Sequence, residues 1–352
     1  MIAPGETIGI LGGGQLGRML AMAAAQLGYR CHIYAPETDA IAADVCGAFT
    51  NAGWDDTAAL ARFAADCAVI TFEFENVPVA ALAALGAVPL HPARNALATA
   101  QDRLSEKTFV TDLGGRAAPF APVDSMADLL AAIDAIGAPG ILKTRREGYD
   151  GKGQWRIASA AEAAGLALSA QPLIYEGLVR FSAEFSVILC RGADGEIRVW
   201  DSARNDHEKG ILSRSTIPAG AAIAAQVAEA RTLARAVAEA LDYVGVLALE
   251  FFATADGPVF NEMAPRVHNS GHWTIEGAIT SQFENHIRAI CGLPLGDTTL
   301  AAKGVVMDNL IGDAAHDWAA ILGDPANHLH LYGKAAARPG RKMGHVTRLI
   351  LD

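Results

Sequence analysis

Cysteine is scarce in this sequence, and its few copies are scattered. The 352 residues include five cysteines that form no CxxC pair, namely Cys31, Cys46, Cys67, Cys190 and Cys291. An odd, dispersed set fits reduced thiols and excludes a disulfide framework or a cysteine zinc site. The sequence therefore predicts a cytoplasmic location.

Long apolar runs and a leader sequence are also missing. No apolar stretch approaches 18 residues without a charge, so we expect no membrane span and no membrane partner. The segment Met1 to Thr7 contains Pro4, Gly5 and Glu6, which does not resemble the apolar core of a signal peptide. These absences predict a soluble protein.

Positive charge is in short supply. The chain has 28 Lys and Arg against 39 Asp and Glu, a formal net charge of −11 at pH 7. Such a balance argues against broad nucleic-acid binding, so anionic ligands must be bound by local basic clusters. With 51% hydrophobic and 19% charged residues, the composition is that of a well-buried globular protein. The length suggests about two to three domains.

A glycine-rich turn follows the first expected strand. Thr7 to Leu11 is a short apolar run, and Gly12, Gly14 and Gly17 then fit the pattern GxGxxG before a helical stretch. Such a turn lets the backbone approach a phosphate at a helix N-terminus. The second strand ends at Tyr34 without an acid to hold a ribose. We therefore expect a bare phosphate or a mononucleotide; NAD(P), or a tight turn without a ligand, are the alternatives.

The third expected strand leads into an acidic segment. A helix is predicted over 56–66 and a strand over Ala68 to Phe72, directly before Glu73-Phe74-Glu75-Asn76. Ligands of open α/β sheets bind at the carboxyl ends of the strands. Residues 73–76 are therefore expected to face the ligand of the glycine turn, unless both acids only cap the next helix. A strand at Val88 to Leu90 and a helix from about Asn95 complete this first domain.

A basic, glycine-rich loop follows an expected strand at Gly140 to Lys143. Residues 143–154 read KTRREGYDGKGQ and hold four basic residues and three glycines. The order differs from the GxxxxGK[ST] of a P-loop, so this is not a Walker motif. Because the N–H groups of a glycine-rich loop can converge on phosphate oxygens, we predict a lid over a polyphosphate. An exposed basic hairpin turn is the alternative.

Two carboxylates accompany the strands after this loop. An expected strand over Leu173 to Tyr175 ends at the segment Glu176 to Val179, and Glu184 lies at the start of a strand over Ala183 to Cys190. The Glu176 carboxylate, beside exposed backbone, is expected to hold an adenine and its ribose.

A β-hairpin is predicted over residues 247–263. Leu247 to Ala253 is apolar and rich in aromatic residues, Thr254 to Gly257 are turn residues, and Pro258 to Met263 is a second short strand. Each strand carries one carboxylate, Glu250 and Glu262, among residues that favour burial.

The register of this hairpin decides what the two carboxylates do. If Ala253 faces Val259 across a five-residue loop, Glu250 faces Glu262, and two opposed, buried carboxylates repel each other. A cation between them relieves the repulsion, and an oxygen-only ligand set favours Mg²⁺ or Mn²⁺. The polar segment 265–272, PRVHNSGH, favours a metal-and-anion site. One solvent-facing and one edge glutamate is the alternative.

The end of the chain is locally basic. Residues 333–351 hold no acid and carry five positive side chains, Lys334, Arg338, Arg341, Lys342 and Arg348. In an acidic protein this predicts a phosphate site, with a solvated basic tail as the alternative.

Together these motifs resemble those of the ATP-grasp ligases. The resemblance rests on the lid KTRREGYDGKGQ, the paired Glu250 and Asn261-Glu262, and the run APRVHNSGH. The segments GGGQLGRML, EFENVP and RPGRKMGH are similar to those of one family among these ligases, the N5-carboxyaminoimidazole ribonucleotide synthetases. The resemblance covers essentially the whole chain.

This resemblance implies a fold and a reaction. The implied fold is α/β with α+β lobes, and it has three domains. A Rossmann-like pre-ATP-grasp domain spans 1–100, and an ATP-grasp domain spans 101–292, with a lid subdomain at about 115–182. A C-terminal domain over 293–352 completes the ribonucleotide site. Family members join ATP, bicarbonate and 5-aminoimidazole ribonucleotide through carboxyphosphate, giving the N5-carboxylated ribonucleotide, ADP and phosphate in purine biosynthesis. ATP is thus the expected co-substrate, with Mg²⁺ or Mn²⁺, and a homodimer is expected because relatives are commonly dimers.

By matching positions, the resemblance also implies site residues. The expected ATP contacts are Arg103, Lys143, Gly148, Tyr149, Asp150, Gly151, Lys152, Gly153, Gln154, Glu176, Gly177, Leu178, Val179, Glu184, His207, Asn261 and Glu262. The expected metal ligands are Glu250 and Glu262. The residues expected around bicarbonate and the transfer step are Tyr149, Arg266, His268, Asn269 and Lys334. The expected ribonucleotide contacts are Gln15, Leu16, Glu75, Asp150, Lys152, Lys334 and Arg341.

Two positions depart from the family pattern. Lys152 stands where many members have Arg, which keeps the charge but loses the bidentate fork. The segment Asn205 to Lys209 differs around His207.

Other functions stay open at this stage. Another ATP-grasp ligase, such as a formate-dependent glycinamide ribonucleotide transformylase, is the nearest alternative. A nicotinamide-dependent oxidoreductase built on the glycine turn belongs to a different class. A catalytically silent nucleotide-binding regulator is disfavoured because the carboxylate pair, the lid and the anion segment are all present.

Overall fold

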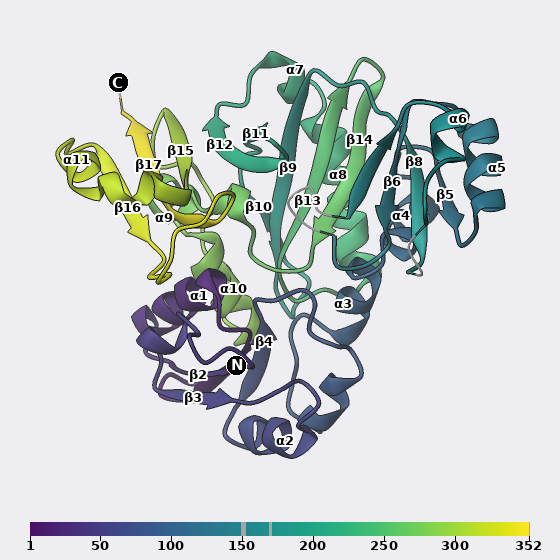
Figure 1. Cartoon of the computed structure of the whole chain (residues 1–352). Coiled ribbons are helices and arrows are strands. Elements are labelled where there is room, and N and C mark those ends of the chain that lie inside the picture. Colours follow the sequence, from purple (N-terminus) through teal and green to yellow (C-terminus); the bar gives the residue numbers. More distant parts are fainter. Residues whose placement is uncertain (149–152, 169–170, 352) are drawn as a thin grey trace.

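The described residues of the computed structural model, 1–148, 153–168 and 171–351, form three β-sheets with helices packed around them (Figure 1). This is the mixed α/β architecture that the sequence predicted. Tyr149, Asp150, Gly151 and Lys152, which the sequence assigned to the lid, lie outside the described residues.

The N-terminal sheet is parallel, with the strand order β3-β2-β1-β4. Its elements are β1 (Thr7–Leu11), α1 (Gln15–Gln26), β2 (Arg30–Ala35), β3 (Ala48–Asn51), α2 (Thr57–Ala65) and β4 (Val69–Phe72). Since β1 lies between β2 and β4, the glycine turn after β1 and the acidic segment after β4 lie at the same edge. That is the juxtaposition that the sequence predicted.

Two details of this first part differ from the sequence prediction. Strand β3 was not expected, because its residues are only partly buried and show no long apolar run. The strand predicted at Val88 to Leu90 is a single bridge between Ile70 and Leu90. Its middle residue, Pro89, has no N–H group for a longer ladder.

A smaller antiparallel sheet of the order β5-β8-β6-β7 lies within the segment predicted as the lid subdomain. It follows the helices α3 (Arg94–Ala100) and α4 (Arg103–Asp112), and its elements are β5 (Phe120–Val123), α5 (Met126–Ile136), β6 (Gly140–Thr144), β7 (Gln154–Ile157), α6 (Ala160–Ala163) and β8 (Leu173–Gly177). The basic loop connects β6 to β7, as expected of a lid hairpin.

Among the described residues, the largest sheet has nine strands. Eight of them follow the order β14-β13-β9-β11-β12-β15-β17-β16, and the ninth, β10, pairs with β9. The strands are β9 (Ala183–Arg191), β10 (Ile197–Val199), β11 (Arg204–Glu208), β12 (Ile211–Ile217), β13 (Gly245–Thr254), β14 (Gly257–Ala264), β15 (Gly304–Ile311), β16 (Asn327–Leu331) and β17 (Lys342–Ile350). The segment predicted as the C-terminal domain supplies β15, β16 and β17. It therefore extends the central sheet.

The helices of this central part are α7 (Ala221–Ala224), α8 (Val227–Ala240), α9 (Thr274–Gly277), α10 (Gln282–Ile290) and α11 (Trp318–Leu322). Helix α10 packs against α1, and one buried cluster joins Leu20 of α1 to Phe283 and Ile287 of α10. The hydroxyl of Thr71 in β4 also hydrogen-bonds the ring of His286 at 2.8 Å. These contacts fix the first domain beside the central sheet, as Figure 1 shows.

No helix within the described ranges is long and apolar enough to cross a bilayer.

Candidate active site

The hairpin of β13 and β14 brings the two predicted metal carboxylates together. Glu250 pairs directly with Glu262 across the strands. The reasoning that predicted this pairing was wrong in one step, because Ala253 faces Pro258 and not Val259. A bulge at Asn261 shifts the register by one residue and restores the pairing of the carboxylates.

The two carboxylates differ in their surroundings. Burial and the neighbouring charge of Glu262 raise the pKa of Glu250 to about 7. Burial acts on Glu262 in the same direction, but the guanidinium of Arg103 at 3.0 Å outweighs it and keeps the pKa of Glu262 below its usual value. Arg103 also donates to the Gly148 carbonyl oxygen at 3.0 Å, which connects the hairpin to the lid.

This pair fits a hard divalent cation. Two opposed carboxylates, of which one has its pKa raised by the charge of the other, are stabilised when a cation lies between them. In the part of the chain that the structure describes, no group of three or more acidic, His or Cys side chains is arranged to hold a metal. A cation bound here would thus take its other ligands from water and from phosphate oxygens, as Mg²⁺ commonly does.

A cavity of about 300 Å³ opens on one side of the carboxylate pair. Phe181 and Phe252 form its apolar wall, stacked with ring centroids 4.6 Å apart. Lys143 of β6, which is buried, supplies positive charge. The predicted ATP contacts that line this cavity are Arg103, Lys143, Gly153, Gln154, Glu184, His207, Asn261 and Glu262. A cavity with an aromatic wall and positively charged side chains in its lining suits a purine nucleotide.

The ring of His207 is held at this cavity by its neighbour on β9. Its Nδ1 lies 3.2 Å from a carboxylate oxygen of Glu184. Burial lowers the pKa of His207, but the hydrogen bond and charge of Glu184 reverse this, so the pKa lies above its usual value.

The segment Glu176 to Val179 is also among the predicted ATP contacts. These residues line neither this cavity nor the larger one described below. Glu176 is buried, only 4% exposed, and its carboxylate lies 2.9 Å from the Lys143 ammonium and 3.4 Å from that of Lys107. Its pKa is lowered despite burial, because the two lysines favour the charged form. In this structure the Glu176 carboxylate fixes Lys143.

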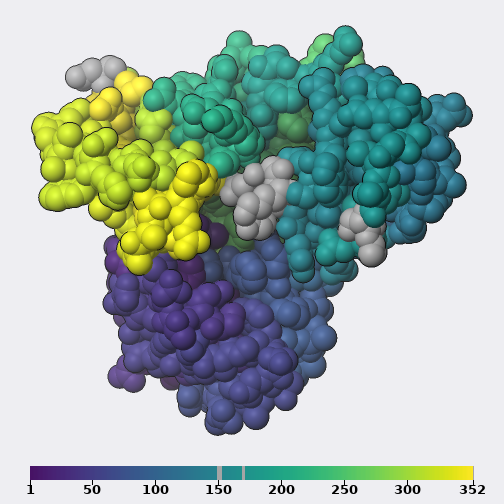
Figure 2. Space-filling view, viewed as in Figure 1, coloured from purple at the N-terminus to yellow at the C-terminus, as the bar shows by residue number. Residues whose placement is uncertain are grey.

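A second cavity of about 830 Å³ lies on the other side of the carboxylate pair. It is lined from every part of the chain: by Gln15 and Leu16 from the N-terminal sheet, Gly148 from the lid, Arg266 after the hairpin, and Arg341 near the C-terminus. The remaining predicted residues that line it are Glu75, Arg103, Glu250, Glu262, His268, Asn269 and Lys334. Figure 2 shows the surface on which the N-terminal, lid and C-terminal parts meet.

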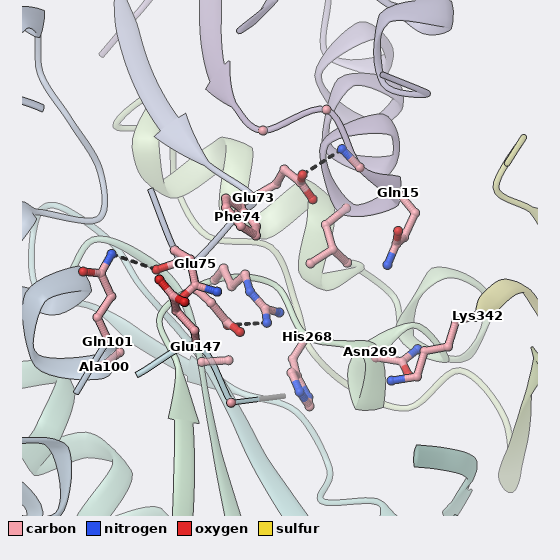
Figure 3. A pocket seen from close by; sticks show the side chains of 18 of the residues that line it. Gln15, Glu73, Phe74, Glu75, Ala100, Gln101, Glu147, His268, Asn269 and Lys342 are labelled. Atoms are coloured by element: carbon pink, nitrogen blue, oxygen red, sulfur yellow. Dashed lines mark hydrogen bonds and ion pairs between the residues drawn. The ribbon is translucent and has the colours of Figure 1, made fainter. Parts of the chain in front are cut away.

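The two cavities share one wall. Among the described residues, those that line both are Arg103, Glu250, Glu262, His268, Asn269 and Lys342. Figure 3 shows His268, Asn269 and Lys342 on this side of the larger cavity, facing Gln15 and Glu75. A group activated in the smaller cavity could therefore reach a molecule in the larger one.

The glycine turn already holds an anion from the protein. The N–H groups of Gly14 and Gly17 donate to the Glu73 carboxylate at 2.7 Å and 3.4 Å, as the dashed line at Glu73 in Figure 3 shows for the shorter bond. Burial raises the pKa of Glu73, while these N–H groups act in the opposite direction. The phosphate expected at this turn would meet the Glu73 carboxylate, so the structure does not support a phosphate on these amides.

Arg266 and Glu75, predicted to contact different substrates, form an ion pair (Figure 3). The side-chain amide of Gln101 donates to the Glu75 backbone carbonyl oxygen at 3.0 Å. The ion pair of Arg266 and Glu75 joins the acidic segment after β4 to the polar segment after β14.

Asn269 is held by a reciprocal pair of amide hydrogen bonds with Asn309 of β15, each 2.9 Å long. Sequence reasoning placed Lys342 in the basic tail but not in the site, although it lines both cavities. The sequence signal that could have identified Lys342 as a site residue is its position directly after Arg341, a predicted ribonucleotide contact. In the structure, Lys342 begins β17.

Comparison with known proteins agrees with this arrangement. Models of a ribonucleotide synthetase preATP-grasp domain, an ATP-grasp domain and a phosphoribosylaminoimidazole carboxylase C-terminal domain match residues 5–101, 108–283 and 305–351. The chain is 52% identical to the N5-carboxyaminoimidazole ribonucleotide synthase of Brucella melitensis, over 99% of this chain and 97% of that protein.

Solved structures of the same family are similar over their whole length. The N5-carboxyaminoimidazole ribonucleotide synthetase of Thermus thermophilus is 48% identical, with a TM-score of 0.90 over 97% of this chain and 93% of that one. The N5-carboxyaminoimidazole synthase of Aspergillus clavatus, solved with ADP and 5-aminoimidazole ribonucleotide, is 30% identical, with a TM-score of 0.89 over 98% and 94%. On its sequence, its fold and the geometry of its site, the chain belongs to the N5-carboxyaminoimidazole ribonucleotide synthase family of ATP-grasp ligases.

Proposed function

We propose that this protein carboxylates 5-aminoimidazole ribonucleotide on its exocyclic amine, using ATP and bicarbonate, in purine biosynthesis. The observation that carries the proposal is the wall shared by the two cavities, at which Glu250, Glu262 and His268 stand between the smaller and the larger cavity. The reaction needs such a wall, because an intermediate made from ATP must meet a second substrate without contact with bulk water.

The smaller cavity is assigned to ATP. The purine would lie against Phe181 and Phe252, and the phosphates would extend toward Lys143 and Arg103. Glu250 and Glu262 would hold Mg²⁺, which would supply positive charge to neutralise the charge that develops on the phosphates. In-line attack of a bicarbonate oxygen on the γ-phosphorus then breaks the bond to the leaving ADP and forms carboxyphosphate.

Arg266, His268, Asn269 and Lys334 are assigned to bicarbonate and the transfer step. Arg266 offers a bidentate guanidinium to a carboxylate-like anion, and in this structure it is already paired with such a group, Glu75. Carboxyphosphate divides into CO₂ and phosphate. The amine lone pair then attacks the carbon of CO₂, and a proton leaves the nitrogen as the carbamate forms.

The larger cavity is assigned to the ribonucleotide. Because Glu73 occupies the amides of the glycine turn, we assign the substrate phosphate to the basic residues near the C-terminus, Lys334, Arg341 and Lys342. Gln15, Leu16 and Glu75 then face the ribose and the imidazole. The related enzyme solved with ADP and 5-aminoimidazole ribonucleotide supports two separate sites of this kind.

One assay tests this function. Release of ADP, followed by a coupled assay, should require both bicarbonate and 5-aminoimidazole ribonucleotide for full rate. Turnover with formate in place of bicarbonate would instead favour a formate-dependent transformylase. Binding of NADH, detected by its fluorescence, would favour the oxidoreductase alternative.

Assembly and location complete the proposal. We propose a homodimer, on the family resemblance, and light scattering after gel filtration would test it. We also propose a cytoplasmic location, supported by five described cysteines that form no disulfide.

A further inference from the structure

A buried chain of hydrogen bonds leads through the central sheet to His268. The Ser215 hydroxyl on β12 donates to the Asn205 side-chain oxygen on β11 at 2.9 Å, and the Asn205 amide nitrogen donates to the Ser186 hydroxyl on β9 at 2.9 Å. Ser186 lies 2.6 Å from the Ser270 hydroxyl, which lies 2.8 Å from Nδ1 of His268. We call Ser215, Asn205, Ser186 and Ser270 the relay residues.

The relay residues are all shielded from water. Each relay residue is at most 3% exposed. Since a buried hydroxyl has one proton and no water to replace a lost partner, the direction of every bond in the chain is set by its neighbours.

The amide of Asn205 sets that direction. Its oxygen accepts from Ser215, so its NH₂ group faces Ser186 and must donate. The Ser186 hydroxyl accepts this bond and is left to donate to Ser270. The Ser270 hydroxyl in turn donates to Nδ1 of His268.

One backbone contact agrees with this direction. The Ser270 N–H also points at Nδ1 of His268, at 3.4 Å. A nitrogen that accepts from an N–H group carries no proton, so the proton of the ring lies on Nε2. The side chain of Gln282 holds the backbone of His268 at both of its polar atoms, with bonds of 2.9 Å and 2.7 Å.

The proton on Nε2 faces the reaction site. Nε2 lies 3.3 Å from a carboxylate oxygen of Glu250, on the wall shared by the two cavities. The charged or titratable groups nearest the ring are Glu250 on β13, Arg266 after β14, Lys342 on β17 and His207 on β11.

We propose that Asn205, through Ser186 and Ser270, fixes His268 as the tautomer with its proton on Nε2, so that His268 acts as a hydrogen-bond donor to the carboxyl group in transfer and not as the base. This role rests on the proposed function, while the tautomer itself does not. The relay residues are positioning residues, because none of them lines either cavity. The amine proton then goes to another acceptor, for which the released phosphate dianion is chemically suited.

The direct test is the protonation of the His268 ring in the intact protein. Nitrogen-15 NMR of histidine-labelled protein reports which ring nitrogen carries the proton, and the His268→Gln variant identifies the signal by its loss. We expect the proton on Nε2 in the wild type. A proton on Nδ1 would overturn the proposal whatever the enzyme's activity.

The Asn205→Asp variant should reverse the chain. A carboxylate cannot donate to Ser186, so Ser186 would donate to it, Ser270 would donate to Ser186, and Nδ1 of His268 would gain a proton. We expect kcat to fall about 10- to 100-fold, as for other groups that orient a site residue, with the KM for ATP changed less than about twofold. An unchanged ring signal together with an unchanged kcat would refute the relay.

A milder variant and a control complete the experiment. Ser186→Ala breaks the chain without adding charge, and it should lower kcat in the same way if Asn205→Asp does not fold. Ser202→Ala is the matched control, because the Ser202 hydroxyl is buried and has no hydrogen-bond partner within the described chain. Equal losses of kcat in Ser186→Ala and Ser202→Ala would contradict the proposal. Absence of ribonucleotide-dependent ADP release in the wild type would instead contradict the proposed function and leave the NMR result standing.

Discussion

The ammonium group of Lys107 lies 2.9 Å from the backbone carbonyl oxygen of Asn261. Asn261 is the bulged residue of β14, and the bulge is what places Glu262 opposite Glu250. One residue before Lys107, the Glu106 carboxylate accepts a hydrogen bond from the Met263 N–H at 2.6 Å. Helix α4 therefore holds the backbone on both sides of Glu262.

Replacing Lys107 by Met should disturb this arrangement. The side chain is fully buried and also pairs with Glu176 at 3.4 Å, so its loss leaves a buried carboxylate with one cation fewer. Removing one partner of a buried pair costs about 3–5 kcal/mol. We expect a loss of this order in the free energy of unfolding, measured with denaturant, and a higher Mg²⁺ concentration for half-maximal turnover. The exposed Lys303 offers the control Lys303→Met. Wild-type metal dependence in Lys107→Met would show that the bulge does not need this contact.

Glu262→Gln should abolish Mg²⁺-dependent ATP turnover and leave the fold intact. The amide keeps the shape of the carboxylate but loses the charge that a cation and Arg103 require. Turnover is measured by ADP release, and folding by circular dichroism. Glu229→Gln serves as the control, because Glu229 pairs with Arg116 on the surface. The metal assignment is wrong if Glu262→Gln turns over ATP like the wild type.

Arg341→Ala should raise the KM for the ribonucleotide far more than the KM for ATP. Arg341 lines the larger cavity only, where its Nη1 donates to the Ala336 carbonyl oxygen at 2.8 Å. Hydrogen bonds to charged groups contribute about 1.5–3 kcal/mol, which corresponds to roughly a 10- to 100-fold rise in KM. Arg338→Ala is the matched control, since Arg338 is exposed and lines neither cavity. An unchanged ribonucleotide KM in Arg341→Ala would refute the role of the basic segment.

Glu106→Gln should change how stability depends on pH. Burial raises the pKa of Glu106 from 4.5 to about 8, although Lys107 and Arg103 act against it. The folded state therefore binds more protons than the unfolded state between these values, and this group makes stability fall as pH rises through that window. Gln keeps an acceptor for the Met263 N–H without this titration.

The measurement is the difference in unfolding free energy between variant and wild type, from urea titrations at several pH values. The difference should move in favour of Glu106→Gln between pH 5 and pH 9, with a slope of up to about 1.4 kcal/mol per pH unit. Parallel stability curves for the two proteins would contradict the pKa of Glu106.

The sequence alone determined the parts of this protein that depend on local pattern. Alternating apolar residues and turn chemistry predicted the hairpin of Glu250 and Glu262, glycine spacing predicted the turn before α1, and the basic glycine-rich loop predicted a connection between two lid strands. The motifs near both ends of the chain indicated the family, and the comparisons confirm that family. The hairpin, the glycine turn and the basic loop are each encoded in one short, continuous segment.

Only the tertiary structure decided which distant groups meet. The carbonyl oxygen of the bulged Asn261 accepts a hydrogen bond from Lys107, which is 154 positions away. The N–H group of Gly14 donates to Glu73, which is 59 positions away. Ser186 and Ser270 of the relay are 84 positions apart. Hydrogen bonds of this kind depend on sheet order and burial, not on neighbouring sequence. A sequence pattern can therefore indicate which residues belong to a site, but it does not show which of them contact each other. The glycine turn is an example: its spacing predicts N–H groups that attract an anion, and only the tertiary structure shows that the Glu73 carboxylate accepts from them.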